Sequence, residues 1–147
     1  MKSNEITAKG NRMKKLISII VLSCFLMLLC SGCKNIKIEE AEREQLGYTV
    51  LQQDEVPETI KELIEQRKVK EFQLTYKSDE DLYLFKGYGQ QMTGGYSIQV
   101  VDLSESKNGI FFETKLLGPM EADIGGEPSY PFIGVKIKYQ DKPVLFR

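Results

Sequence analysis

The stretch from Tyr96 to Thr114, YSIQVVDLSESKNGIFFET, decides the fold class of this chain. Residues that favour strands recur at every second position on both sides of an Asn-Gly pair. They are Tyr96, Ile98 and Val100 before the pair and Ile110, Phe112 and Thr114 after it. An Asn-Gly pair between two alternating runs is the strongest short-range signal of a β-hairpin. The stretch therefore predicts two antiparallel strands joined at Ser106–Gly109.

The same period of two continues in both directions from this hairpin. Upstream, Phe72, Leu74 and Tyr76 alternate with polar residues, and the charged turn KSDED at 77–81 separates them from LYLF at 82–85. Downstream, apolar side chains alternate between 132 and 139, at Ile133, Val135, Ile137 and Tyr139. Pro131 precedes this last strand, where a missing N–H does least harm. A short strand at 48–51 is also expected.

One segment follows a helical period instead. Pro57 with acidic neighbours marks a helix start, because proline's missing N–H is harmless in the first turn and carboxylates suit the positive end of the helix. The apolar residues that follow fall on one face, at Val56, Ile60, Leu63 and Ile64. This pattern predicts an amphipathic helix that ends near Arg67 and packs one side on the core.

These elements make up one globular domain, expected over residues 47–147. The cysteines Cys24, Cys30 and Cys33 lie in or beside a single apolar stretch, so the domain has no thiol for a disulfide. Its stability must come from a hydrophobic core. Short turns imply antiparallel pairing. We therefore expect a mostly β (α+β) fold: a small antiparallel β sandwich or partly open barrel of about six strands, with one covering amphipathic helix.

Residues 1–32 have the order of a secretory signal peptide. Lys14 and Lys15 precede an apolar run of 14 residues, Leu16–Leu29, after which small residues lead to a polar chain. A membrane-spanning helix needs about 20 apolar residues, so the run is short for a permanent span. Residues 1–12 are polar and without pattern, which is typical of an upstream extension, so Met1 and Met13 are alternative starts.

Ser31-Gly32-Cys33 resembles the lipobox of bacterial lipoprotein signals, in which a small pair precedes an invariant cysteine. Cys30 departs from the family, which usually has an aliphatic residue there. The resemblance implies cleavage before Cys33 and acylation of Cys33, with palmitate among the acyl chains. Cleavage at Cys24 would leave the apolar Phe25–Leu29 on the mature chain. Two or more acyl chains anchor a protein stably, so we expect lipid anchoring on the extracytoplasmic face of the cell membrane.

The remaining chain is acidic. Residues 1–32 hold five of the 20 basic residues and one of the 21 acidic residues, so 33–147 has a net charge of -5. Nucleic acid is a poor partner for such a chain, because binding depends on neutralising phosphates. Residues 33–46 are rich in glutamate and have few apolar residues, which predicts a solvated tether.

Catalytic chemistry has few candidate residues. The chain has no histidine, which excludes Ser-His-Asp and Cys-His nucleophiles and zinc sites built from Cys and His. Asp79–Asp81 lacks the spacing and glycine of calcium loops. Asp102, Glu105 and Glu113 leave a carboxylate pair for cell-wall or glycan hydrolysis as a minor alternative. We expect no enzyme activity, no cofactor and no metal.

Several motifs between Phe72 and Phe146 resemble the C-terminal domain family named after PrcB, a lipoprotein subunit of a bacterial surface protease complex. They are Gly87-Tyr88-Gly89, Thr93-Gly94-Gly95-Tyr96-Ser97-Ile98, Leu117-Gly118-Pro119 and Ser129-Tyr130-Pro131-Phe132 followed by Val135-Lys136-Ile137. The resemblance implies a small, non-catalytic, mostly β domain that supports the assembly or stability of a protease complex. It implies another envelope or secreted protein as partner, and it brings no catalytic residues.

The glycine-rich motifs also provide the candidate partner-binding loop. It comprises Gly87, Tyr88, Gly89, Thr93, Gly94, Gly95 and Tyr96. Tyrosine rings supply rigid contact area at low entropy cost, and glycines at strand ends usually serve a turn. An alternative is a protease inhibitor, because Thr93, Gly95 and Tyr96 resemble part of the inhibitory loop of chagasin-type inhibitors of papain-like proteases.

Overall fold

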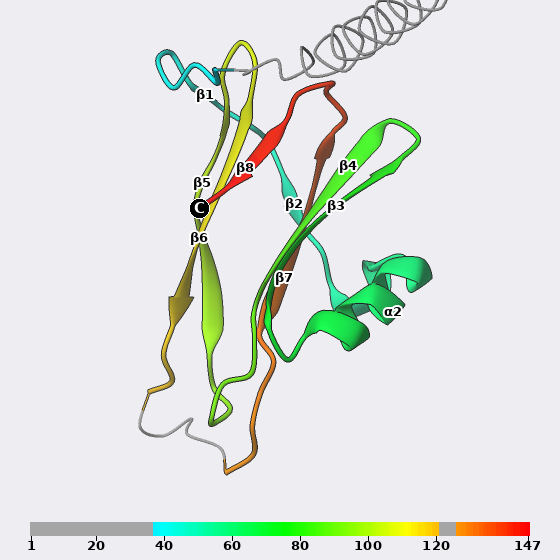
Figure 1. Cartoon of the computed structure of the whole chain (residues 1–147), viewed down its shortest axis with the longest axis vertical. Coiled ribbons are helices and arrows are strands. Elements are labelled where there is room, and N and C mark those ends of the chain that lie inside the picture. Colours follow the sequence, from blue (N-terminus) through cyan, green and yellow to red (C-terminus); the bar gives the residue numbers. More distant parts are fainter. Residues whose placement is uncertain (1–36, 121–125) are drawn as a thin grey trace, which may run out of the picture. The chain divides into compact units, whose positions relative to one another are not determined.

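The computed structural model describes residues 37–120 and 126–147, and it confirms a mostly β fold with one α-helix (Figure 1). The elements in chain order are β1 (Glu44–Gln45), β2 (Thr49–Val50), the 3-10 helix η1 (Gln53–Glu55), α2 (Glu58–Arg67), β3 (Glu71–Ser78), β4 (Asp81–Tyr88), β5 (Ser97–Glu105), β6 (Ile110–Leu117), β7 (Phe132–Lys138) and β8 (Val144–Phe146). The six predicted strands correspond to β2 through β7. The sequence reading missed β1 and β8, which are only two and three residues long.

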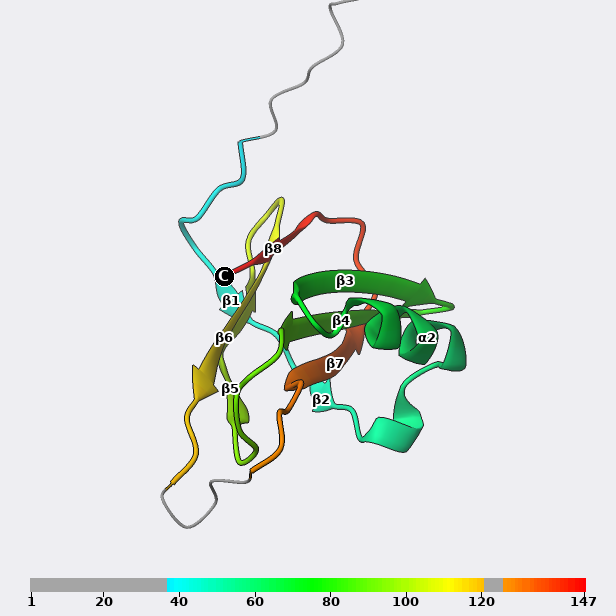
Figure 2. The ribbon, with the colours of Figure 1, turned by 60° about the horizontal axis from the view of Figure 1, so that its bottom comes forward.

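The strands form two four-stranded sheets, in the orders β1-β5-β6-β8 and β2-β7-β4-β3. Every pairing between them is antiparallel except that of β6 with β8, which is parallel. The Asn-Gly hairpin joins β5 to β6 as predicted. Figure 2 shows the two sheets as separate layers, with α2 beside the second sheet. Of the two predicted architectures, a sandwich or a partly open barrel, the arrangement is consistent with the sandwich, and the described strands form no closed barrel.

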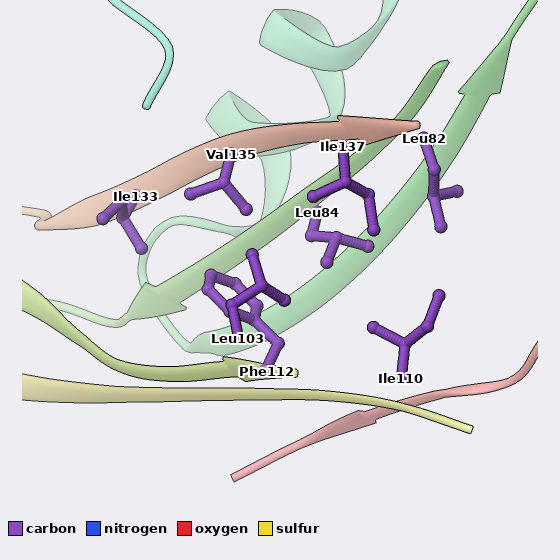
Figure 3. Close-up of a cluster of buried hydrophobic side chains, with 8 residues drawn as sticks. All are labelled: Leu82, Leu84, Leu103, Ile110, Phe112, Ile133, Val135 and Ile137. Atoms are coloured by element: carbon purple, nitrogen blue, oxygen red, sulfur yellow. The ribbon is translucent and has the colours of Figure 1, made fainter. Parts of the chain in front are cut away.

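The main core lies between the two sheets (Figure 3). Its buried residues come from four strands: Leu82 and Leu84 from β4, Leu103 from β5, Ile110 and Phe112 from β6, and Ile133, Val135 and Ile137 from β7. The predicted alternation thus identified the inward faces of β6 and β7. Burying apolar area of this kind contributes about 25 cal/mol per Å².

A second core lies between α2 and the opposite face of the β2-β7-β4-β3 sheet. Val56, Ile60 and Ile64 are buried there against Phe72 and Phe85, with Leu63 partly buried beside them. All four residues of the predicted apolar stripe therefore face the sheet. One sheet is consequently covered on both faces.

A β-bulge in β5 changes which side chains face the core. The register with β6 shifts between Val100 and Asp102, so Val101 is the extra residue, and it is 51% exposed. In a regular strand without a bulge, Leu103 would point to the face opposite Ile98 and Val100, because it lies an odd number of residues from both and side chains alternate along a strand. The bulge brings all three to the core side.

Residues 38–46, expected as part of a solvated tether, lie against the domain. Gln45 pairs with Ser104, and the Leu46 amide donates to the Leu103 carbonyl at 2.9 Å. The Arg43 guanidinium lies 4.5 Å from the Phe111 ring centroid and forms a 3.2 Å ion pair with Asp102. Ile38–Arg147 accordingly forms one compact unit, distinct from residues 1–37.

Replacing Gly134 with alanine should destabilise the domain. A Cβ at this position in β7 would lie 2.6 Å from Cε1 of Phe85, which is fully buried, so the ring or the backbone would have to shift. We expect Gly134→Ala to lower the unfolding free energy by about 1–3 kcal/mol, as overpacked cores do. Gly118→Ala is the matched control, because nothing lies within 4 Å of its Cβ. Equal unfolding free energies in urea titrations of the two variants would contradict this account.

Candidate functional site

The predicted loop lies at one end of the sandwich, between the end of β4 and the start of β5 (Figure 1). Two strand pairings bring the neighbouring segments to the same end: Ser97 pairs with Leu117 at the end of β6, and Gly87 pairs with Phe132 at the start of β7. The segments 89–96, 118–120 and 126–131 thus meet there. We call this the loop end.

Hydrogen bonds hold the backbone of the loop. Gln91 and Ser129 exchange backbone bonds at 2.8 and 3.1 Å, and the Ser129 hydroxyl donates to the Thr93 carbonyl at 2.6 Å. The Gln91 side-chain amide donates to the Tyr88 carbonyl at 2.9 Å. These bonds link two segments far apart in the sequence and present the loop in a fixed shape.

Two glycines of the loop have backbone angles that disfavour other residues. Gly89 has φ +71° and Gly95 has φ +80°. Gly89 is also buried, with the backbone of Val69–Glu71 within 3.1 to 3.2 Å of the place where a Cβ would lie. Gly87 is buried within β4, and the Phe72 ring fills the space beside it. These three glycines, all among the predicted loop residues, determine the backbone path of the loop. They provide no side chain that a partner could contact.

The two tyrosines also contact the domain. The Tyr88 hydroxyl lies 2.7 Å from the Thr114 hydroxyl, so a side-chain hydrogen bond joins β4 of one sheet to β6 of the other. Tyr96 is half-buried and lines a cleft of about 350 Å³ with Val50, Ile98 and Phe132, among other residues. The fold holds both rings in place, and only part of the surface of each tyrosine is exposed to a partner.

The most exposed apolar side chains at the loop end are methionines that the sequence reading missed. Met92 is 82% exposed within the loop, and Met120 is 76% exposed three residues after the end of β6. Methionine is flexible and polarizable, which suits it to adaptable binding surfaces. The sequence feature that could have identified Met92 is an apolar residue close to Gly94 and Gly95 in a predicted turn.

The acidic candidates lie apart from the loop, and two of the three are bound to cations. Asp102 binds Arg43, and it accepts hydrogen bonds from Gln45 at 2.8 Å and Ser104 at 2.7 Å. Glu105 forms an ion pair with Lys142. Such pairing is typical of acids that stabilise a fold. Glu113 is the cross-strand neighbour of Asp102.

The acidic turn 79–81 is likewise paired with lysines of β7. Lys138 donates to Asp81 at 3.1 Å, and this hydrogen bond raises the pKa of Lys138 above its ordinary value, with the charge of Asp81 adding to the effect. Asp79 has φ +52°, a conformation that Asp tolerates in tight turns. Across the described ranges 37–120 and 126–147, no group of three or more Asp, Glu, Cys or His side chains is placed to hold a metal ion. In the same ranges no helix is long and apolar enough to cross a membrane.

The fold and the site define a class of protein: a two-sheet β domain with one covering helix and a glycine-shaped loop at one end. Residues 82–138 match the model of the family described as PrcB C-terminal. The match runs from β4 through β7 and includes the loop, which confirms the resemblance seen in the sequence. No curated protein and no solved structure matches the chain.

Replacing Gly95 with valine should mainly lower the melting temperature. A β-branched residue at φ +80° is strained, and asparagine tolerates positive φ better. We expect Gly95→Val to reduce the unfolding free energy by about 1–3 kcal/mol, and Gly95→Asn to reduce it less. Thermal unfolding followed by circular dichroism measures both. A Gly95→Val variant of normal stability would contradict the assignment of this glycine to the turn.

Proposed function

We propose that the chain is a lipid-anchored extracytoplasmic lipoprotein whose non-catalytic domain binds another protein through the loop end. We further propose that it acts as an accessory or stabilising subunit of a surface protease complex. The observation that carries the proposal is the loop end itself, where the exposed Met92 lies on a backbone held by bonds among Gln91, Thr93 and Ser129. The match to the PrcB C-terminal family supports the same reading.

The route of the chain into the domain keeps the loop end accessible. Ile38 and Glu39 contact the turn between β5 and β6: a Cβ on Gly109 would lie 2.5 Å from the Ile38 side chain, and the Glu39 amide donates to Asn108 at 2.8 Å. That turn lies at the opposite end of β6 from the loop end. Because β6 has eight residues, its two ends are about 23 Å apart at roughly 3.3 Å per step between residues.

The proposed anchor fits this route. Cys33 lies five residues before Ile38, so its Cα stays within about 18 Å of Ile38 even if the backbone between them is fully extended. An anchor at Cys33 therefore restrains the end of the domain that the loop does not occupy. The loop end stays free to bind a partner.

Lipidation at Cys33 predicts a residue-specific loss of membrane anchoring. Cells that express Cys33→Ala should incorporate no labelled palmitate into the chain, because the acylated thiol is missing. Cys24→Ala and Cys30→Ala are matched controls in the same apolar stretch, and both should keep the label. Labelling followed by detergent phase partitioning makes the measurement. Label that persists in Cys33→Ala, or disappears only in Cys24→Ala, would overturn the assignment.

Binding through the loop end predicts that Met92→Asp loses a partner. A charge at this exposed position should leave the fold unchanged and reduce recovery of the partner about tenfold or more in crosslinked pull-downs from membranes, because an apolar contact is replaced by a desolvated carboxylate. Lys107→Asp, in the turn at the opposite end, should recover as much partner as the wild type.

Two outcomes of this experiment argue against the proposal. Recovery of no protein by the wild-type chain at normal expression would count against a binding role. If the purified chain inhibits a papain-like protease and Met92→Asp abolishes this inhibition, the result would instead favour the alternative function, a protease inhibitor that acts through Thr93–Tyr96.

A further inference from the structure

The strand β3 is a long sheet edge that no described strand covers. It has eight residues, pairs only with β4, and runs from Glu71 to Ser78 without a bulge. Figures 1 and 2 draw it at one side of its sheet. The other outermost strands, β1, β2 and β8, have two or three residues each. Natural proteins usually shorten, bend or cover such an edge, because its free backbone groups pair with other strands.

The register shows which backbone groups are free. The β3–β4 ladder closes on the two-residue turn Asp79–Glu80, so the even-numbered residues of β3 bond to β4. The odd-numbered residues from Glu71 to Lys77 therefore point their N–H and C=O groups away from the sheet. Their side chains are exposed, whereas Phe72, Leu74 and Tyr76 face α2.

The sequence of this edge is self-complementary. When two copies of β3 are placed antiparallel with Leu74 opposite Leu74, Phe72 faces Tyr76, Gln73 faces Thr75 and Glu71 faces Lys77 of the second copy. In this register the odd-numbered residues form the hydrogen-bonded pairs, as their outward backbone groups require. Because the two copies are related by two-fold symmetry, the Phe72–Tyr76 pair and the Glu71–Lys77 pair each occur twice. Aromatic pairs and opposite-charge pairs across neighbouring strands stabilise sheets.

We propose that β3 pairs with β3 of a second copy of this chain, centred on Leu74, so that two sheets join into one of eight strands. The contact is isologous, which is the commonest symmetry of oligomers. It is separate from the loop end and does not rest on the proposed function.

The surface beside β3 can accommodate a second copy of the chain. A cleft of about 770 Å³ lies beside the first residues of the strand and is lined by Gln66, Arg67, Val69, Lys70, Glu71, Phe72 and Gln73. Tyr76 of the second copy, opposite Phe72 and on the α2 side, would lie in this cleft. Within the part of the chain that the structure describes, Arg67 and Lys70 have no ion pair, so they are available to a tyrosine ring.

The charged pair is also available. Glu71 binds the buried Lys86, yet 62% of its side chain remains exposed. Lys77 lies with Nζ 3.7 Å from the Tyr139 ring centroid and, among the described residues, forms no ion pair. Glu71 bonds to Lys86 through Oε1, so Lys77 of the second copy can approach its other carboxylate oxygen while the ion pair with the buried Lys86 stays intact.

Disulfide trapping tests the register. In a full-length chain with Cys24, Cys30 and Cys33 replaced by serine, Leu74→Cys should form a covalent dimer under mild oxidation, because the two Cβ atoms face each other at about 4.5–5.5 Å. Gln73→Cys alone and Thr75→Cys alone should remain monomeric on non-reducing gels, and an equimolar mixture of the two should crosslink. Equal crosslinking of all three single variants, or none of Leu74→Cys, would overturn the proposal.

A charge reversal measures the equilibrium without cysteines. Lys77→Glu places like charges opposite each other twice per dimer and should weaken the dimerisation constant about tenfold in analytical ultracentrifugation. Lys107→Glu makes the same charge change away from the edge and should dimerise like the wild type. Circular dichroism checks that both variants are folded. A wild-type chain that is monomeric at all concentrations, or equal constants for the two variants, would contradict β3 pairing. Binding of a foreign strand with no self-association would assign this edge to a different partner.

Discussion

Leu84 and Phe85 are neighbours in β4, and both side chains are fully buried, on opposite faces of one sheet. Successive strand residues point to opposite faces, so this sheet needs two apolar coverings at once. The second sheet covers the Leu84 side and α2 covers the Phe85 side. The need to bury both faces of this sheet explains the glycines at positions 87 and 134. At these positions the rings of Phe72 and Phe85 occupy the space that a Cβ would need. Neither covering layer can be removed without exposing half of the central strands.

The parts of the fold that the sequence predicted are those in which one residue type repeats at a fixed period. Ile133, Val135 and Ile137 and the stripe from Val56 to Ile64 belong to this group. The bulge at Val101 breaks the period, and only the position of Leu103 in the core reveals it. The strands β1 and β8 are too short to carry a pattern, and they form because residues distant in the sequence supply their partners. The contacts of the acidic segment before Leu46 with the domain, such as the ion pair of Arg43 with Asp102, could not be predicted because they are not local.

The candidate loop shows why motif residues and contact residues differ. Gly89 and Gly95 are required by backbone angle, and Tyr88 is required by its hydrogen bond to Thr114. A motif of this kind identifies the family because it specifies the shape of the turn. The side chain that such a turn exposes is free to vary, and here it is Met92. Sequence reasoning found the turn from its glycines, but exposure depends on the bond between Ser129 and Thr93, which no local pattern encodes.

The proposed anchor and the proposed β3 pairing together restrict how the protein lies on a membrane. Antiparallel pairing of two β3 strands places a two-fold axis perpendicular to the joined sheet, so the two copies run in opposite directions. If both copies are anchored in one membrane near their β5–β6 turns, an axis along the membrane normal places the two anchors at the same height. The joined sheet then lies parallel to the membrane, and the two loop ends face away from each other along its surface. A partner bound at each loop end would meet no steric conflict with the second copy, since β3 lies at a different edge from the loop. Anchoring, self-pairing and partner binding can therefore occur at the same time, because they use the β5–β6 turn, the β3 edge and the loop end respectively.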